Sequence, residues 1–171
     1  MSSGDIIVRP SMSDDMDAIT DIYSVCVRTG FGTFEIEPPD VMEMTARRNN
    51  VLQQQLPYLV ATRNEKVVGY AYAALYRTRP AYENTVENSV YVREDAQGSG
   101  VGKVLLTDLI EHCRRAEKKQ IVAVIGDSEN RGSIGLHRSL GFRLVGILEA
   151  VGYKHGRWVD TVIMQKNLAD D

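Results

Sequence analysis

Hydrophobic positions near the start of the chain change from the spacing of a strand to the spacing of a helix. Residues 6–9 form a short, apolar and β-prone run, which predicts a strand. Residues 13–15 supply Ser and Asp side chains of the kind that cap helices. The apolar residues that follow recur at helical spacing: Met16, Ile19, Ile22 and Tyr23. We therefore expect a strand and then a helix at the N-terminus.

The next part of the chain predicts a second helix and a hairpin. Residues 31–35 interrupt the helical period, and Pro residues, which favour the first turn of a helix, open a second helix over residues 38–54. Residues 58–61 and 67–75 are apolar and β-prone on either side of a turn-like segment at 63–66. Two such runs joined by a short polar turn are typical of a β-hairpin.

The second half of the chain alternates between strand and helix patterns and closes with two β-prone runs. Apolar and polar side chains alternate over residues 85–92, as in a strand with one buried face. An amphipathic helical pattern at 101–110 and a buried strand at 121–125 follow, and this order requires parallel neighbours. Residues 142–151 and 159–166 flank a short turn and predict an antiparallel pair. The expected fold class is α/β, with a mixed central sheet flanked by helices.

Composition and charge narrow the classes of function. The 171 residues, 43% of them hydrophobic, suffice for one core, so residues 1–171 are expected to form a single domain. A net charge of −3 gives no overall attraction to nucleic acid or to an anionic membrane. Cys26 and Cys113 lack the spacing of metal ligands or of a redox pair, so no metal is expected. Residues 1–5 carry no targeting signal, and no apolar run is long enough to span a bilayer, which indicates a cytoplasmic protein.

A glycine-rich segment between an expected strand and an expected helix carries the main functional signal. Glycines let the backbone approach a ligand closely, and the start of the following helix presents free N–H groups and the positive end of the helix dipole. A phosphate is the natural ligand of such a turn. The residues of the turn are Gln97, Gly98, Ser99, Gly100, Val101 and Gly102, followed by Lys103.

Two common phosphate-binding motifs do not fit this glycine turn. A Walker-type loop needs four residues between its glycines, whereas three residues separate Gly98 from Gly102. It also needs Ser or Thr after its Lys, but Val104 follows Lys103. A dinucleotide-binding turn needs the order G-x-G-x-x-G, and the order here is G-x-G-x-G. A tight turn without a ligand is the simplest alternative.

The spacing of Gln97, Gly100 and Gly102 resembles the pyrophosphate-binding turn of the GNAT superfamily of N-acetyltransferases. Residues 89–92 match the strand that in this superfamily lines the pantetheine arm of acetyl-CoA, and Asn130 together with residues 136–142 matches its second cofactor motif. The resemblance implies that acetyl-CoA is the co-substrate. The residues expected to bind it are Val90, Tyr91, Val92, Gln97, Gly98, Ser99, Gly100, Val101, Gly102, Lys103, Asn130, Ser133, His137 and Arg138.

Over nearly its whole length the chain also resembles a narrower group, the phosphinothricin and methionine sulfoximine N-acetyltransferases. The likeness is carried by residues 76–79, 81–82, 85–92 and 156–160. It implies a small-molecule acceptor, the α-amine of a small amino acid or an analogue, and a homodimer formed partly by the hairpin around Trp158. The superfamily also implies that strand 85–92 is bulged and splayed from the next parallel strand. The Val92 N–H, or one close by, would then polarise the acetyl carbonyl.

Two residues are expected to take part in the chemistry. Glu87 lies on the polar side of strand 85–92, where it can accept a proton from the amine directly or through water. The alternative is a strand-surface carboxylate paired with a cation. His137 stands where most GNAT members have a tyrosine proposed to protonate the leaving thiolate. Because a thiolate with a pKa of roughly 8.5 leaves readily, His137 either supplies that proton or only positions its neighbours.

The acceptor amino acid is expected to lie between a pair of arginines and an aromatic loop. Arg77 and Arg79 lie at a strand end, and a guanidinium binds a carboxylate through two hydrogen bonds, although solvated surface is the alternative. Residues 31–35 are expected to form the opposite wall. The expected substrate-binding residues are Phe31, Phe34, Glu35, Tyr76, Arg77, Thr78, Arg79, Tyr82, Thr85, Val86 and Glu87.

Two other functions stay open. A GNAT member can acetylate a protein N-terminus or a lysine, although the sequence has no evident acidic groove or peptide-binding insertion. A non-catalytic sensor would bind acetyl-CoA without turnover and would be unaffected by Glu87→Gln. The amino-acid acceptor is the main hypothesis because the narrower motifs and the arginine pair favour it.

Overall fold

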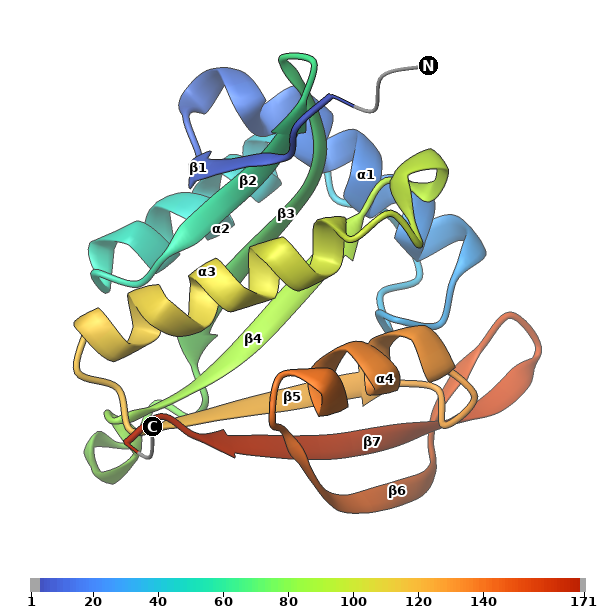
Figure 1. Ribbon diagram of the computed structural model, residues 1–171. Helices are drawn as coiled ribbons and strands as arrows, with labels where there is room; N and C mark the ends of the chain where they lie inside the picture. The colour runs from blue at the N-terminus through green and yellow to red at the C-terminus, as the bar shows by residue number, and fades with distance from the viewer. Residues whose placement is uncertain (1–3, 170–171) are drawn as a thin grey trace.

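Seven strands form one mixed sheet in the order β1-β2-β3-β4-β5-β7-β6 in the computed structural model (Figure 1). The structure describes residues 4–169, so residues 1–3 of the segment expected to lack a targeting signal lie outside the described residues. The pairing of β4 with β5 is parallel, as the sequence predicts, and the neighbouring pairs on both sides are antiparallel. The strands are β1 (Ile7–Pro10), β2 (Tyr58–Arg63), β3 (Lys66–Leu75), β4 (Thr85–Val92), β5 (Gln120–Gly126), β6 (Arg143–Lys154) and β7 (Arg157–Asn167).

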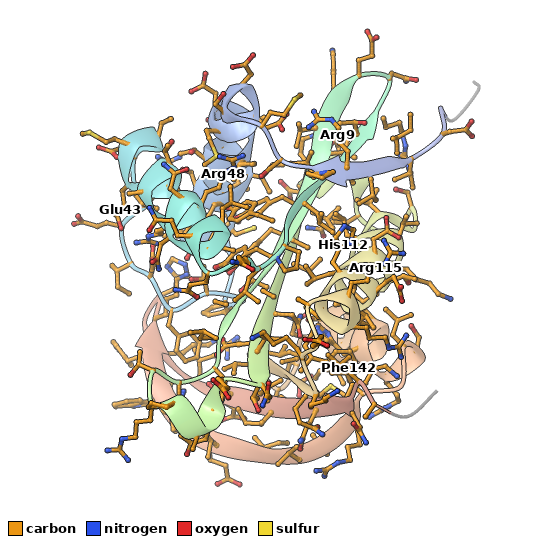
Figure 2. All side chains as sticks on the ribbon, turned by 90° about the vertical axis from the view of Figure 1, so that its left-hand side faces the viewer. Arg9, Glu43, Arg48, His112, Arg115 and Phe142 are labelled. Carbon is orange, nitrogen blue, oxygen red and sulfur yellow. The ribbon has the colours of Figure 1, made fainter. Side chains whose placement is uncertain are left out.

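Helices cover both faces of the sheet, which confirms the α/β class. In Figure 2, Glu43 and Arg48 of α2 lie on one side of the sheet, and His112 and Arg115 of α3 lie on the other. Helix α1 accompanies α2, and α4 lies on the same face as α3 (Figure 1). The helices are α1 (Met16–Thr29), α2 (Val41–Gln53), α3 (Val101–Arg115) and α4 (Arg131–Ser139), with one-turn 3-10 helices η1 (Ser13–Asp15), η2 (Pro80–Tyr82) and η3 (Glu94–Ala96).

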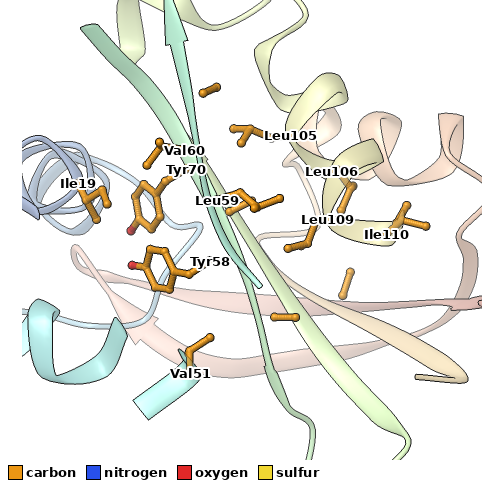
Figure 3. Close-up of a cluster of buried hydrophobic side chains, with 14 of the residues drawn as sticks. Ile19, Val51, Tyr58, Leu59, Val60, Tyr70, Leu105, Leu106, Leu109 and Ile110 are labelled. Atoms are coloured by element: carbon orange, nitrogen blue, oxygen red, sulfur yellow. The ribbon is translucent and has the colours of Figure 1, made fainter. Parts of the chain in front are cut away.

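The hydrophobic core has two layers, one on each side of β2 and β3. Ile19 of α1 and Tyr70 of β3 pack on the α1 side, and Leu105 and Leu109 of α3 pack on the other (Figure 3). Each of these side chains is buried, and such burial stabilises the fold by about 1.5–3 kcal/mol per large apolar side chain. The two layers bury the centre of the sheet on both of its faces.

The sheet opens between its two parallel strands. β4 pairs with β5 from Thr85 to Asn88, and the pairing does not extend to the last four residues of β4. Those residues still pair with β3 in continuous register up to Val92. The expected bulge in β4 is therefore wrong for its ladder with β3, because the splay arises where β5 diverges after Ala123. The expected gap itself is confirmed.

Asp15 joins the first strand to the first helix. Both of its carboxylate oxygens accept hydrogen bonds from the Arg9 guanidinium, at 2.7 and 2.8 Å, and the Met12 N–H donates to one of them at 2.7 Å. The side chain is buried, and the hydrogen bonds from Arg9 lower the pKa of the Asp15 carboxyl. This carboxylate therefore stabilises the folded state in its charged form.

We expect Asp15→Asn to lower the free energy of unfolding by about 2 kcal/mol at pH 7, measured by urea unfolding, because a charged, buried hydrogen-bond acceptor is lost. The pKa of Asp15 is lower in the folded state, so its contribution is complete above the unfolded value of about 3.9 and is lost as the pH falls through the folded value. The difference between variant and wild type should therefore shrink in acid. Asp14→Asn, at the exposed neighbour, is the control, and an equal loss there would contradict the assignment.

Candidate active site

A cavity of about 950 Å³ lies in the gap between β4 and β5. Its walls come from the diverging ends of these two strands, from α1, from the segment after α1 and from the start of α4. The cavity therefore opens where the parallel pairing stops. The residues that the sequence predicts for the site and that line this cavity are Phe31, Val90, Tyr91, Val92, Gln97, Asn130, Ser133 and His137.

Backbone N–H groups of β4 face the gap. The Arg93 N–H donates to the Val68 carbonyl of the β3 segment at 2.8 Å, so Arg93 and Val68 form a hydrogen-bonded antiparallel pair. Hydrogen-bonded and non-hydrogen-bonded pairs alternate along such a ladder. The N–H groups of Val92 and Val90 consequently point away from β3 and toward the gap, beyond the last residue of β4 that pairs with β5.

The glycine turn forms an open cradle at the start of α3. Gly98 and Gly100 have φ angles of +70° and +89°, in the left-handed region that favours glycine, and a Cβ at either position would meet no atom within 4 Å. The first N–H groups of α3, from Val101 and Gly102, have no acceptor within the helix. A Cβ on Gly102 would lie 3.2 Å from Cδ2 of Leu136, which leaves little room between α3 and α4. The turn thus combines free donors with open space.

His137 is buried between α4 and β4, with 3% of its surface exposed. Its Nδ1 lies 2.8 Å from the Ser133 carbonyl oxygen, which only accepts, so Nδ1 carries the proton. The other ring nitrogen, Nε2, then accepts from the Asn88 amide at 2.9 Å. Burial lowers the pKa of His137, so the ring is neutral at pH 7. Both ring nitrogens are therefore already hydrogen-bonded inside the protein.

Three other residues expected to bind the cofactor lie at the edge of the cavity or outside it. The Asn130 side chain caps α4, because its oxygen accepts from the Ser133 N–H at 3.1 Å while its amide group contacts the Gly126 carbonyl at 3.4 Å. Asn130 is therefore the N-cap residue of α4 as well as part of the cavity wall. Arg138 and Lys103 are exposed on α4 and α3 and are not among the cavity-lining residues.

Glu87 lies outside the cavity lining, on the face of β4 that carries Tyr91. Side chains alternate along a strand, and Tyr91 packs edge-on against Tyr23 of α1 at 5.1 Å, so this face is the one under α1. Burial raises the pKa of Glu87, and the positive charge of Arg77 opposes that shift. Glu87 is therefore a half-buried carboxylate in the field of Arg77.

Several residues expected to bind the acceptor contact one another in the loop between β3 and β4. The Arg77 guanidinium lies 4.3 Å from the centre of the Tyr76 ring, and Tyr82 packs edge-on against Tyr76 at 5.8 Å. Thr78 and Arg79 are exposed in the same loop. Of the strand residues that follow, Thr85 is half-buried, whereas the Val86 side chain, expected at the substrate, is fully buried in the core.

The aromatic loop forms a wall on the same face. Tyr72, which pairs with Ser89 in the sheet, has its pKa raised first by burial and then by the negative charges of Glu87 and Glu35. Both carboxylates therefore lie close enough to act electrostatically on the Tyr72 hydroxyl. Glu35 accepts a 2.6 Å hydrogen bond from Arg47 of α2, and Phe34 is 38% exposed.

Two absences concern the residues that the structure describes. Between residues 4 and 169 no three His, Cys, Asp or Glu side chains gather in a way that would hold a metal ion. No helix in that range is both long enough and apolar enough to cross a membrane. The two cysteines lie in α1 and α3, and both are free thiols.

A family model described as an acetyltransferase (GNAT) domain matches residues 8–163. The chain belongs to the GNAT acetyltransferase family. The phosphinothricin N-acetyltransferase of Alcaligenes faecalis is 52% identical to it over 161 residues, which cover 94% of this chain and 82% of that protein. The L-methionine sulfoximine/L-methionine sulfone acetyltransferase of Pseudomonas aeruginosa is 39% identical, with 94% of each chain covered.

A solved GNAT structure has the same arrangement of elements. The phosphinothricin acetyltransferase of Sinorhizobium meliloti, in complex with AcCoA, superposes with a TM-score of 0.92 at 41% identity, covering 95% of this chain and 88% of that one. The fold of this GNAT acetyltransferase, including the open sheet, is therefore the one that its sequence predicts.

Some residues of this GNAT acetyltransferase reach the site without having been expected there. Arg63, at the end of β2, donates to the Ser99 hydroxyl of the glycine turn at 3.1 Å. Asn88 and Cys26 line the cavity. Helical periodicity indicates that α1 has a buried face, but it does not distinguish a cavity wall from a core. No sequence signal connects Arg63 with a turn that lies 36 residues further on.

Proposed function

We propose that this GNAT acetyltransferase transfers the acetyl group of acetyl-CoA to the α-amine of a small amino acid or an analogue of the phosphinothricin, methionine sulfoximine or methionine sulfone type. The observation that carries the proposal is the position of the cavity. It runs along the open edge of β4 as far as Gln97, the one residue of the glycine turn that lines it, and the half-buried carboxylate of Glu87 lies on the same strand. The names of the relatives support the class of acceptor.

The residues of the cavity fit acetyl-CoA, which when bound supplies a thioester acyl group. The free N–H groups at the start of α3 suit the pyrophosphate, and Arg63 and Lys103 add positive charge near the turn. The open edge of β4 offers backbone groups to the amides of the pantetheine arm. Arg138, exposed on α4, would contribute at most to the rim.

The Val92 and Val90 N–H groups stabilise negative charge on the acetyl oxygen in this proposal. They face the gap, as the alternation of the β3–β4 ladder requires, and they are held by a rigid strand. Donors that are already oriented need no reorganisation when the carbonyl carbon becomes tetrahedral. Either N–H can act, since both lie beyond Asn88, the last residue of β4 that pairs with β5.

Glu87 acts as the general base that takes a proton from the acceptor ammonium, directly or through one water. Its raised pKa makes it a stronger base than an exposed carboxylate, which suits proton removal near neutral pH. The Arg77 guanidinium lies within the field of Glu87 and holds the acceptor carboxylate, with exposed Arg79 as a second cation. The amine would thereby be held between its binding group and its base.

His137 positions the Asn88 side chain and does not protonate the leaving thiolate. Its Nδ1–H is donated to Ser133, and its Nε2 lone pair is occupied by Asn88. A neutral ring in this arrangement has no proton to give at pH 7. The thiolate leaves without an acid because its own pKa is roughly 8.5.

Thiol release tests the proposed function. The purified protein would be incubated with acetyl-CoA and, separately, with phosphinothricin, methionine sulfoximine, methionine sulfone and a panel of peptides. We expect free coenzyme A to appear with the amino-acid analogues. Turnover confined to peptides would favour a protein N-acetyltransferase, and binding of acetyl-CoA without turnover of any amine would favour a sensor.

We also propose that the protein acts in the cytoplasm as a homodimer. β6 and the start of β7 carry apolar side chains that are about half exposed or more, and apolar groups gathered in this way are typical of an interface. Trp158 is 65% exposed and packs edge-on against Tyr153 at 5.1 Å. The exposed side chains are Leu144, Val145, Ile147, Leu148, Val151, Tyr153 and Trp158.

We expect Ile147→Glu to convert the dimer into a monomer at micromolar concentration, because it would bury two carboxylates across a two-fold interface. Light scattering coupled to size exclusion measures the mass. Met42→Glu, at an apolar position on α2 that is even more exposed, is the control and should stay dimeric. A wild-type protein with the mass of one chain would contradict the proposal.

A further inference from the structure

The aromatic loop, residues 31–35, depends on other elements for its position. It follows the end of α1 at Thr29 and precedes α2 at Val41, and it contains no helix or strand of its own. Its first residue, Phe31, lines the cavity, so any movement of the loop changes the cavity wall. The contacts that hold this loop come largely from the distant β6–β7 hairpin.

Lys154, the last residue of β6, holds the backbone of the loop. Its ammonium donates to the Thr33 carbonyl at 2.8 Å, and the Thr33 hydroxyl is hydrogen-bonded to Tyr23 of α1 at 2.8 Å. Thr33 is therefore fixed from two sides. Lys154 is only 2% exposed, and burial lowers its pKa, against the opposing effects of Cys26 and Glu35.

A buried ammonium with a neutral carbonyl partner contributes little to stability. Removing the charge from water is unfavourable, and replacing a buried charged group by an apolar one of similar size is often neutral or stabilising. Methionine has nearly the length and shape of lysine without its charge. The presence of Lys154 at this position is thus better explained by the carbonyl that it holds than by the stability of the fold.

The hairpin also holds the two aromatic rings of the loop. The Arg157 guanidinium lies 3.9 Å from the centre of the Phe31 ring and is ion-paired with Asp127, while His155 packs edge-on against the same ring at 5.4 Å. A guanidinium stacked on an aromatic face is attracted by the ring electrons. The Phe31 ring is therefore contacted on its face by Arg157 and edge-on by His155.

The second ring fits a space that only glycine leaves open. A Cβ on Gly152 of β6 would lie 2.5 Å from Cε2 and 2.8 Å from Cδ2 of Phe34, far closer than carbon atoms pack. Gly146, on the same strand, has open space at the corresponding position. The Phe34 ring thus packs directly against the backbone of Gly152.

We propose that Gly152, Lys154, His155 and Arg157, together called the loop clamp, are positioning residues that set the shape of the acceptor pocket through the aromatic loop. The proposal rests on the proposed function only for the identity of the pocket. The clamp touches the loop, not the reacting atoms. It should therefore control the affinity and choice of the acceptor amine more than the handling of acetyl-CoA.

Two clamp variants and one matched control test this. Gly152→Ala displaces the Phe34 ring, Lys154→Met removes the donor to Thr33, and Gly146→Ala adds the same methyl group on the same strand where nothing is met. In both clamp variants we expect the KM of the acceptor to rise at least tenfold and the KM of acetyl-CoA to change less than threefold. Lys154→Met should unfold at the wild-type temperature or above.

Hydrogen exchange gives a readout independent of turnover. Amides of residues 31–35 should exchange at least tenfold faster in both clamp variants and at the wild-type rate in Gly146→Ala. Unchanged exchange in the loop of both variants would overturn the proposal, as would an equal rise in both KM values. If the wild-type protein acetylates none of the amines, the proposed function fails, and the exchange rates alone still decide whether the clamp orders the loop.

Discussion

Gly100→Val is expected to reduce kcat/KM for acetyl-CoA at least about a hundredfold, which corresponds to about 2.7 kcal/mol. Gly100 has a φ of +89° at the N-cap of α3, and a β-branched residue is strongly disfavoured there. The new side chain would also occupy the open space beside the first N–H groups of the helix. Steady-state kinetics and calorimetric titration with coenzyme A measure the two effects.

Gly135→Val is the matched control for this change. Gly135 lies within α4, and a Cβ there also meets no atom within 4 Å, but its φ is not in the left-handed region. Valine at this position should leave kcat/KM within about twofold of wild type, because valine is no worse than glycine inside a helix. If Gly100→Val bound coenzyme A as wild type does, the glycine turn would not be the phosphate site.

Glu87→Gln is expected to lower kcat by a factor of about 10² to 10⁴, the range typical for loss of a general base. Glutamine keeps the size of the side chain and its contacts on β4 but cannot accept a proton. Binding of acetyl-CoA should be unchanged, because Glu87 does not line the cavity. Rates are measured with saturating acceptor, and binding by titration.

The pH dependence separates a base from a structural carboxylate. A base must be deprotonated, so the wild-type rate should fall as the pH drops through the pKa of Glu87, and burial moves this acid limb above the position of an ordinary glutamate. The limb should be absent in Glu87→Gln. Glu83→Gln, at an exposed carboxylate four residues earlier, is the control. An acid limb that persists in Glu87→Gln would assign it to another group.

The elements of this fold were predictable because their signals are local. The apolar stripe of α3 and the alternation of β4 arise from residues a few positions apart, and the glycines at 98 and 100 announce a turn that only glycine adopts easily. Strand–helix–strand order then requires β4 and β5 to be parallel. These inferences need no knowledge of tertiary contacts.

The composition of the site was predictable only in part, because its walls meet through packing. Asn88 and His137 are 49 residues apart, and neither residue type indicates that one would bind the other. Val86 was expected at the substrate, but its side chain is part of the core. It lies on the same face of β4 as Asn88, and both side chains are buried. The bulge expected from family resemblance was unnecessary, since divergence of β5 alone opens the gap.

The gap between β4 and β5 also has a consequence for how long the protein survives. Among the described residues, the β4–β5 ladder that joins the β1–β4 half of the sheet to the β5–β7 half has four residue pairs, from Thr85–Gln120 to Asn88–Ala123. A molecule seated in the gap touches both halves and adds its binding free energy to the stability of the folded chain. Resistance to heat and to proteolysis should therefore rise and fall with the concentration of acetyl-CoA. The folded enzyme would then persist longest when its co-substrate is abundant.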